Sequence, residues 1–200
     1  MHPNRAFDIR DTATMRSVVN ERMFGMMVAS TREGLRVAQV PVLLDGEDRL
    51  HFHLARNNPV GQLADGSEVL FLCNGPDGYI SPDWYGLPDQ VPTWNYVSIE
   101  LAGTIHRLPD AELPGIVERL SSAQEQRLHP KPEWHHRKMD QALFARMLKG
   151  IAAYAMIISE WRGTAKLGQN KSPVVRIRAA AGVREQGNPA LADLMVGGLA

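Results

Sequence analysis

The chain has 200 residues, enough for one domain with a sizeable hydrophobic core. Its 22 basic and 22 acidic residues give a formal net charge of zero, so no strong electrostatic field draws it to DNA or to an anionic membrane. Hydrophobic residues make up 44% of the chain, which excludes a disordered protein, and no apolar stretch approaches the length of a membrane span.

The cellular compartment is predicted from the N-terminus and from cysteine usage. The first residues are polar and no apolar signal-peptide core follows them. The sole cysteine, Cys73, lies in an apolar run, so we expect a buried thiol and no disulfide within one chain. Both features predict a cytoplasmic protein.

The N-terminal part of the chain predicts a helix followed by a hairpin. Asp11 or Thr12 can cap a helix that ends near Arg22. Residues 24–30 and 36–44 predict two paired strands. Pro41 has no N–H for a sheet ladder, so we expect it at a bulge, at an edge or where the strand turns towards a ligand.

Residues 50–54 predict a third strand with strict alternation. Its three apolar residues face one way as core and its two histidines, His51 and His53, face the other way, where they are available for function. Asn58-Pro59 predicts the start of a short helix that ends near Gly66.

The rest of the chain predicts two more core strands, several helices and a final strand. Residues 68–74 are apolar on both faces, which predicts a buried strand, and 74–78 predict a turn. The other predicted elements are a strand at 94–105, helices at 110–128 and 137–148, a strand at 152–161, a loop at 166–171 and a short helix at 189–196 in a tail of doubtful order.

This element order predicts a mainly β protein, an antiparallel closed or partly closed barrel with peripheral helices. The sequence has no internal repeat and no alternation of strands with helices. Repeat, Rossmann and TIM architectures are therefore not expected. We expect one domain over 1–171 and a C-terminal tail over 172–200.

The segment from His53 to Pro59 is the first candidate site. It places a capped helix start after a strand end, with the permanently charged fork of Arg56 beside the free amides of the first turn. Such a corner suits a phosphate monoester. The alternative interpretation is an ordinary capped helix with a solvated arginine.

Two further segments carry binding chemistry. Aromatic rings at 79–85 and 91–96 alternate with hydroxyl and amide groups, which suits a planar heterocycle but equally a rigid loop or a dimer interface. The apolar surface of the segment from Trp84 to Trp94 favours a homodimer. The lysines of 166–171 could complete an anion site, or this segment could be a solvated loop.

Taken together, these segments resemble the PaiB family of FMN-binding negative transcriptional regulators, over roughly Phe24 to Lys171. The resemblance implies a split β-barrel related to pyridoxamine-phosphate-oxidase-like flavoproteins, a homodimer, and FMN held non-covalently near the dimer interface. The cofactor-binding residues that it implies are Gln39, Val40, Pro41, His53, Leu54, Ala55, Arg56, Asn57, Asn58, Trp94, Asn95, Lys166 and Gln169.

The sequence departs from the family at two places. Ala38-Gln39 stands where the family usually has Thr-His, and Gly168 replaces a usual serine. Both changes are expected to weaken flavin binding.

Other site chemistries find less support. His51 and His53 lack a third ligand at a recognisable metal spacing, and no serine lies in a nucleophile elbow, so we predict neither a metal site nor catalytic residues of that kind. Neither the net charge nor a helix-turn-helix motif supports DNA as a partner. Two functions remain open, a PaiB-like regulator and an FMN-dependent oxidoreductase that acts on a small substrate, so enzymatic activity is left undecided.

Overall fold

The computed structural model describes residues 2–199, in seven strands and five α-helices with short 3-10 turns. These residues form two compact units. The central unit comprises 19–72 and 101–160, and the terminal unit comprises the described residues of 1–18, 73–100 and 161–200. The expected domain boundary at residue 171 stays a prediction, and the outer ends of the two expected ranges, Met1 and Ala200, lie outside the described residues.

The strands form one sheet in the order β1-β7-β4-β3-β2-β5-β6, with a further pairing between β7 and β6. The pairings β1–β7, β2–β3, β2–β5, β3–β4 and β4–β7 are all antiparallel. The predicted antiparallel, mainly β architecture is therefore confirmed. The strands are β1 Asp8–Ile9, β2 Phe24–Thr31, β3 Gly34–Asp45, β4 Arg49–Ala55, β5 Ser67–Ile80, β6 Thr93–Arg107 and β7 Ile151–Lys166.

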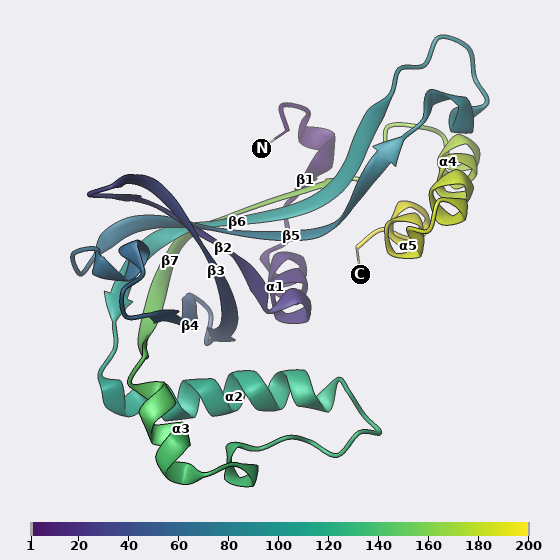
Figure 1. Ribbon diagram of the computed structural model, residues 1–200. Helices are drawn as coiled ribbons and strands as arrows, with labels where there is room; N and C mark the ends of the chain where they lie inside the picture. Colours follow the sequence, from purple (N-terminus) through teal and green to yellow (C-terminus); the bar gives the residue numbers. More distant parts are fainter. Residues whose placement is uncertain (1, 200) are drawn as a thin grey trace. The chain divides into compact units, whose positions relative to one another are not determined.

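The predicted hairpin of β2 and β3 is present in the central unit (Figure 1). Residues 34–41 of β3 pair with β2, whereas residues 42–45 pair with β4. Pro41 is the last residue of the first ladder, opposite Phe24, and directly precedes the second. A residue without an N–H suits this changeover, because one fewer donor has to be satisfied there.

The predicted turn at residues 74–78 is wrong, because these residues continue strand β5. A Cβ added at Gly75 would lie 3.0 Å from the Cβ of Val97 on β6, so the glycine permits close approach of the neighbouring strand. Pairing with a long partner overrides the local turn preference of the Asn-Gly-Pro-Asp-Gly sequence. The expected burial of both faces at 68–74 is also wrong, since burial alternates along β5.

Helix α1, Thr12–Arg22, has its predicted bounds. The Asp11 carboxylate accepts hydrogen bonds from the backbone N–H of Ala13 and of Thr14, at 3.3 and 2.9 Å, and so caps the helix.

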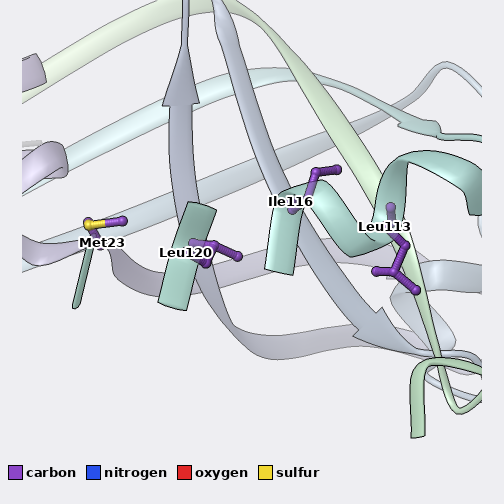
Figure 2. Packing of buried hydrophobic residues seen from close by; sticks show 5 residues of the cluster. Met23, Leu113, Ile116 and Leu120 are labelled. Atoms are coloured by element: carbon purple, nitrogen blue, oxygen red, sulfur yellow. The ribbon is translucent and has the colours of Figure 1, made fainter. Parts of the chain in front are cut away.

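Helix α2, Leu113–Gln126, packs against β3 and β4 in the central unit. Leu113, Ile116 and Leu120 point from one face of α2 into a cluster with Met23 and Ala153 (Figure 2). The 3.6-residue period of the apolar residues produces this face. Arg119 of α2 contacts His51 on β4, and His51 is buried, so the histidine face of that strand is covered in part and was wrongly predicted to be open.

The terminal unit contains a helix that the sequence analysis missed. Helix α4, Pro173–Glu185, packs against α5, Pro189–Gly197, whose position was predicted. A Cβ at Gly182 would lie 2.6 Å from the ring of Trp84, which shows how closely α4 approaches the aromatic segment. This contact, and not a strong apolar period in α4, accounts for its order.

The remaining elements connect these parts. Helix α3, predicted from residue 137, begins four residues later. Within residues 2–199 no helix is both long and apolar enough to cross a membrane. The bounds are α3 Gln141–Leu148, η1 Arg5–Phe7, η2 Pro59–Gln62, η3 Pro82–Tyr85, η4 Asp110–Glu112 and η5 His136–Lys138.

Candidate functional site

The predicted cofactor residues fall into two groups, one in each unit. The central group lies on β3, at the end of β4 and in the turn after it, and comprises Gln39 to Pro41 and His53 to Asn58. The terminal group comprises Trp94 and Asn95 on β6, Lys166 at the end of β7, and Gln169. Each group is described by itself.

The central group begins where the ladder between β3 and β4 ends. The last pair of that ladder is Val42 with Phe52, and the predicted segments 39–41 and 53–55 continue from the same end of it. On its other side β4 stays paired with β7 as far as Ala55. Main-chain groups of 53–55 on the β3 side therefore have no partner in that ladder, and unpaired main-chain groups are satisfied by water or by a ligand.

The members of the central group differ in how far their side chains are exposed to solvent. Val40 and Leu54 have their side chains in the core, so they can offer a ligand only main-chain groups. Gln39, Ala55 and Asn57 are exposed. The side chains that can meet a ligand thus belong to the polar members of this group.

The expected cradle of free amides after Asn58 is not present. The Asn58 side chain accepts a hydrogen bond from the N–H of Val60 at 3.0 Å, which confirms the cap, and the Asn58 carbonyl accepts one from Gly61 at 2.9 Å. The N–H of Arg56 is bonded to the Gly150 carbonyl. A 3-10 turn of four residues forms here in place of the predicted helix, so the amides that would have faced a phosphate are satisfied internally.

Arg56 is held in place by groups from distant parts of the central unit. Its Nε donates to the Lys149 carbonyl at 2.9 Å, and its Nη2 donates to Asp110 Oδ2 at 2.8 Å. Asp110 is also 3.5 Å from Nη2 of Arg107. The hydrogen bond from Arg56 is the main cause that lowers the pKa of the Asp110 carboxyl.

Asp110 and Arg107 belong to this corner, and the sequence analysis did not identify them. Arg56 and Asp110 are 54 residues apart, and no local motif connects them. Only the packing of the η4 turn beside the end of β4 brings the carboxylate to the guanidinium.

His53, directly after the end of the β3–β4 ladder, carries an unsatisfied polar atom. Its Nδ1 is buried and has no hydrogen-bond partner, and burial lowers the pKa of the ring. A neutral imidazole with an unused nitrogen can accept or donate one hydrogen bond. A buried polar atom without a partner is the kind of group that a bound molecule or a water satisfies.

Two residues of the terminal group serve local structure. Lys166 Nζ donates to the Thr93 hydroxyl at 2.5 Å. Gln169 accepts a hydrogen bond from the N–H of Leu167 and donates to the carbonyls of Ala165 and Ala6. Both side chains therefore hold the end of β7 in place. Lys166 keeps its charge and two further donors for a ligand, whereas Gln169 has little capacity left.

The other two residues of the terminal group keep binding capacity. Trp94 is 55% exposed and meets Tyr79 edge to face, with 6.4 Å between ring centroids. Asn95 is only 1% exposed, and its Nδ2 has no partner among the described residues. An exposed ring and an unsatisfied amide are the features that the aromatic segment was expected to supply.

His51 belongs to a different cluster from His53. Arg119 Nη2 of α2 donates to His51 Nδ1 at 3.1 Å, and Asp45 Oδ2 lies 3.4 Å from the same nitrogen. Arg119 Nη1 is 3.8 Å from Asp45 Oδ1. His51 therefore joins α2 to the β3–β4 hairpin, and among the described residues no three His, Cys, Asp or Glu side chains gather as metal ligands.

We predict that acid weakens the fold through these two histidines. Burial lowers the pKa of both His51 and His53 below the ordinary value of 6.5. Their folded-state pKa values are depressed, so their stabilising contribution is complete above pH 6.5 and is lost as the pH falls through the lower folded values. Urea midpoints at pH 7.5 and 5.5 measure the effect.

Replacement of the buried His51 ring separates its contribution to the pH dependence of stability from that of other titrating groups. His51→Gln should reduce the loss of stability between the two pH values, whereas His135→Gln, which changes an exposed histidine, should leave it as in the wild type. An equal pH dependence in wild type and His51→Gln would show that this histidine contributes nothing to it.

Comparison with known structures defines the fold. The FAD- and haem-binding protein of Mycobacterium smegmatis matches with a TM-score of 0.59 at 15% identity, over 80% of this chain and 74% of that chain. The flavocytochrome Anf3 of Azotobacter vinelandii matches with a TM-score of 0.58 at 14% identity, over 82% and 72%. The fold is that of the split-barrel flavoproteins, as predicted.

Sequence comparison gives the family. Residues 1–160 match the family described as "Putative FMN-binding domain", and the chain belongs to that family. It is 26% identical over 203 residues to the protease synthase and sporulation protein PAI 2 of Bacillus subtilis, over 98% of this chain and 96% of that protein. The predicted PaiB-like membership, with FMN as its cofactor, is thereby confirmed.

Proposed function

We propose that this protein binds FMN at the end of β4 and acts as a PaiB-like negative transcriptional regulator. The observation that carries the binding proposal is a pair of guanidinium groups, Arg56 and Arg107, that share the single carboxylate of Asp110. FMN supplies reversible redox chemistry when it is bound.

The charge of this corner suits a phosphate monoester. Two arginines and one aspartate leave a net charge of +1, and the side chain of Arg56 is 35% exposed. A phosphate dianion can approach the unused face of the guanidinium without displacing its bond to the Lys149 carbonyl. Asp110 competes with the phosphate for the same donor group.

The neighbouring polar groups suit the rest of the cofactor. The unsatisfied Nδ1 of His53 and the exposed amide of Gln39 lie on the two strand segments that continue from the end of the β3–β4 ladder. They would orient FMN through its polar atoms while unpaired main-chain groups bond its edge.

Opposite changes at Arg56 and Asp110 test this proposal. Arg56→Gln should raise the dissociation constant of FMN roughly tenfold or more, because a charge-assisted bond to phosphate contributes on the order of 1.5 to 3 kcal/mol. Asp110→Asn should lower it, because it removes the competing carboxylate. Both constants are measured by fluorescence titration with FMN.

Riboflavin, which lacks the phosphate, is the matched control ligand. Its affinity should be nearly the same in wild type, Arg56→Gln and Asp110→Asn, with circular dichroism showing an intact fold. The assignment is wrong if wild type binds riboflavin as tightly as FMN, or if both substitutions leave FMN binding unchanged.

The proposed assembly is a homodimer. Its support is the exposed apolar surface of the aromatic segment, where Leu87, Val91 and Trp94 are 46, 73 and 55% exposed. Leu35 on β3 of the central unit is also largely exposed, at 75%. Light scattering of the titration samples gives the mass, and a monomer at micromolar concentration would contradict the proposal.

The regulatory role rests on family membership, and the terminal helices give it no direct support as DNA readers. Helices α4 and α5 are joined by three residues, as in many helix-turn-helix motifs, but α5 carries no lysine, arginine, asparagine or glutamine. We therefore favour regulation that acts through the flavin or a partner protein in the cytoplasm.

An FMN-dependent oxidoreductase is the second candidate function. Anaerobic titration of the flavin-loaded protein with NADH or NADPH distinguishes the two. Bleaching of the visible flavin band favours the enzyme, and an unchanged band favours the regulator.

A further inference from the structure

A pocket of about 230 Å³ in the terminal unit lies outside the proposed flavin site. Its walls come from β1, α1, the end of β7, α4, α5 and the residues after α5. Most of the lining is aliphatic and none of it is aromatic, so it suits a flexible hydrocarbon better than a planar ring. The aliphatic lining consists of Ile9, Ala165, Leu167, Leu194 and Leu199.

Three polar side chains line the pocket, and two of them are already bonded within the protein. The Thr14 hydroxyl donates to Asp11 Oδ2 at 2.8 Å. Gln169 bonds the main chain at Leu167, Ala165 and Ala6. Arg176 is the third, and it is the lining side chain whose donors remain unused.

Arg176 is a half-buried cation without an acceptor in the described part of the chain. Its Nε is buried and has no hydrogen-bond partner. A guanidinium is charged at every physiological pH and has donors only, so burial without an acceptor is unfavourable. An anion in the pocket would remove this penalty.

A second unsatisfied donor lies near Arg176. A Cβ added at Gly168 would be 3.6 Å from Cγ of Arg176 and 3.7 Å from Nδ2 of Asn95. Asn95 Nδ2 is buried without a partner. Gly168 thus lies beside two side chains that each keep a buried donor without an acceptor, of which Arg176 lines the pocket.

We propose that this pocket binds a small aliphatic carboxylate, with its carboxylate on Arg176 and its hydrocarbon chain against the aliphatic wall. A carboxylate matches the planar fork of arginine, and the chain removes apolar surface from water. The site is separate from the FMN site proposed at the end of β4, because it uses neither Arg56 nor any residue of the central unit. Gln169 in its wall and Asn95 beside it are residues that the family resemblance implied for the cofactor, so competition with FMN is part of the test.

Calorimetric titration with octanoate tests the proposal. We expect saturable binding to the full-length wild-type protein, weaker binding of octanol, which lacks the charge, and no measurable binding of acetate, which lacks the chain. Arg176→Gln should weaken octanoate binding about tenfold or more. Arg176→Lys, which keeps the charge but loses the planar fork, should have a smaller effect.

Arg184→Gln is the matched control, because it removes one positive charge from the same helix at an exposed arginine paired with Asp193. It should leave octanoate affinity unchanged. The proposal is overturned if wild type does not bind octanoate, if Arg184→Gln weakens binding as much as Arg176→Gln, or if Arg176→Gln binds as wild type with a native circular dichroism spectrum. Displacement of octanoate by FMN would also overturn it, since the pocket would then be part of the flavin site.

Discussion

Gly103→Ala is expected to destabilise the protein by about 3 kcal/mol or more, or to prevent folding, because the added methyl group meets backbone. A Cβ at this position would lie 2.1 Å from the Ile157 carbonyl oxygen and 2.9 Å from its carbon. A side chain in the way could rotate, but main chain at the β6–β7 pairing cannot move without breaking ladder hydrogen bonds. The free energy of unfolding in urea, followed by circular dichroism, measures the loss.

Gly115→Ala makes the same chemical change where the structure has room. Gly115 is exposed in α2, and nothing lies within 4 Å of an added Cβ. Alanine favours the helix and restricts the unfolded chain, so this variant should be more stable by roughly 0.5 to 1 kcal/mol. A loss of stability at Gly115 equal to that at Gly103 would contradict the steric explanation.

Ile116→Ala should lower the free energy of unfolding by about 2 to 5 kcal/mol. Ile116 is 2% exposed in the cluster that joins α2 to the sheet of the central unit (Figure 2). Alanine removes buried apolar surface and leaves a cavity that its packed neighbours fill only in part. Equilibrium unfolding in urea gives the value.

Gln124→Ala is the control for α2, because Gln124 is exposed on the same helix. It should change stability by less than about 0.5 kcal/mol. If both variants lose stability equally, the buried cluster would not be what attaches α2 to the sheet.

Elements with strong local periodicity were predicted well. The alternation of β6 and the capped start of α1 at Asp11 depend on neighbours within a few residues, and both appear as expected. The missed helix α4 has buried residues, such as Ala179 and Val183, that alternate with exposed apolar ones such as Ile177. Its apolar face is defined by Trp84 and α5, which the periodicity of α4 alone does not reveal.

The candidate flavin site was predicted in its position but not in its bonding. The segment after β4 was identified because a charged residue and a capped turn follow a strand. The prediction of free amides was wrong, because four residues form a 3-10 turn whose N–H donors bond within the turn. The carboxylate of Asp110 could not be assigned to Arg56 from the sequence, since a contact between residues 54 positions apart leaves no local pattern.

The sequence by itself determined the alternation of β6, the caps at Asp11 and Asn58 and the family to which the chain belongs, because these depend on short-range periodicity and on motifs along the chain. Only the tertiary structure decided which polar groups remain unsatisfied. Gln169 looks free in the sequence and is fully bonded in the fold, whereas His53 and Arg176 keep buried atoms without partners. Hydrogen-bond satisfaction is a property of three-dimensional neighbours. The unsatisfied Arg176 atom carries the proposed carboxylate site, and the unsatisfied His53 atom supports the FMN site that the Arg56–Asp110–Arg107 cluster carries.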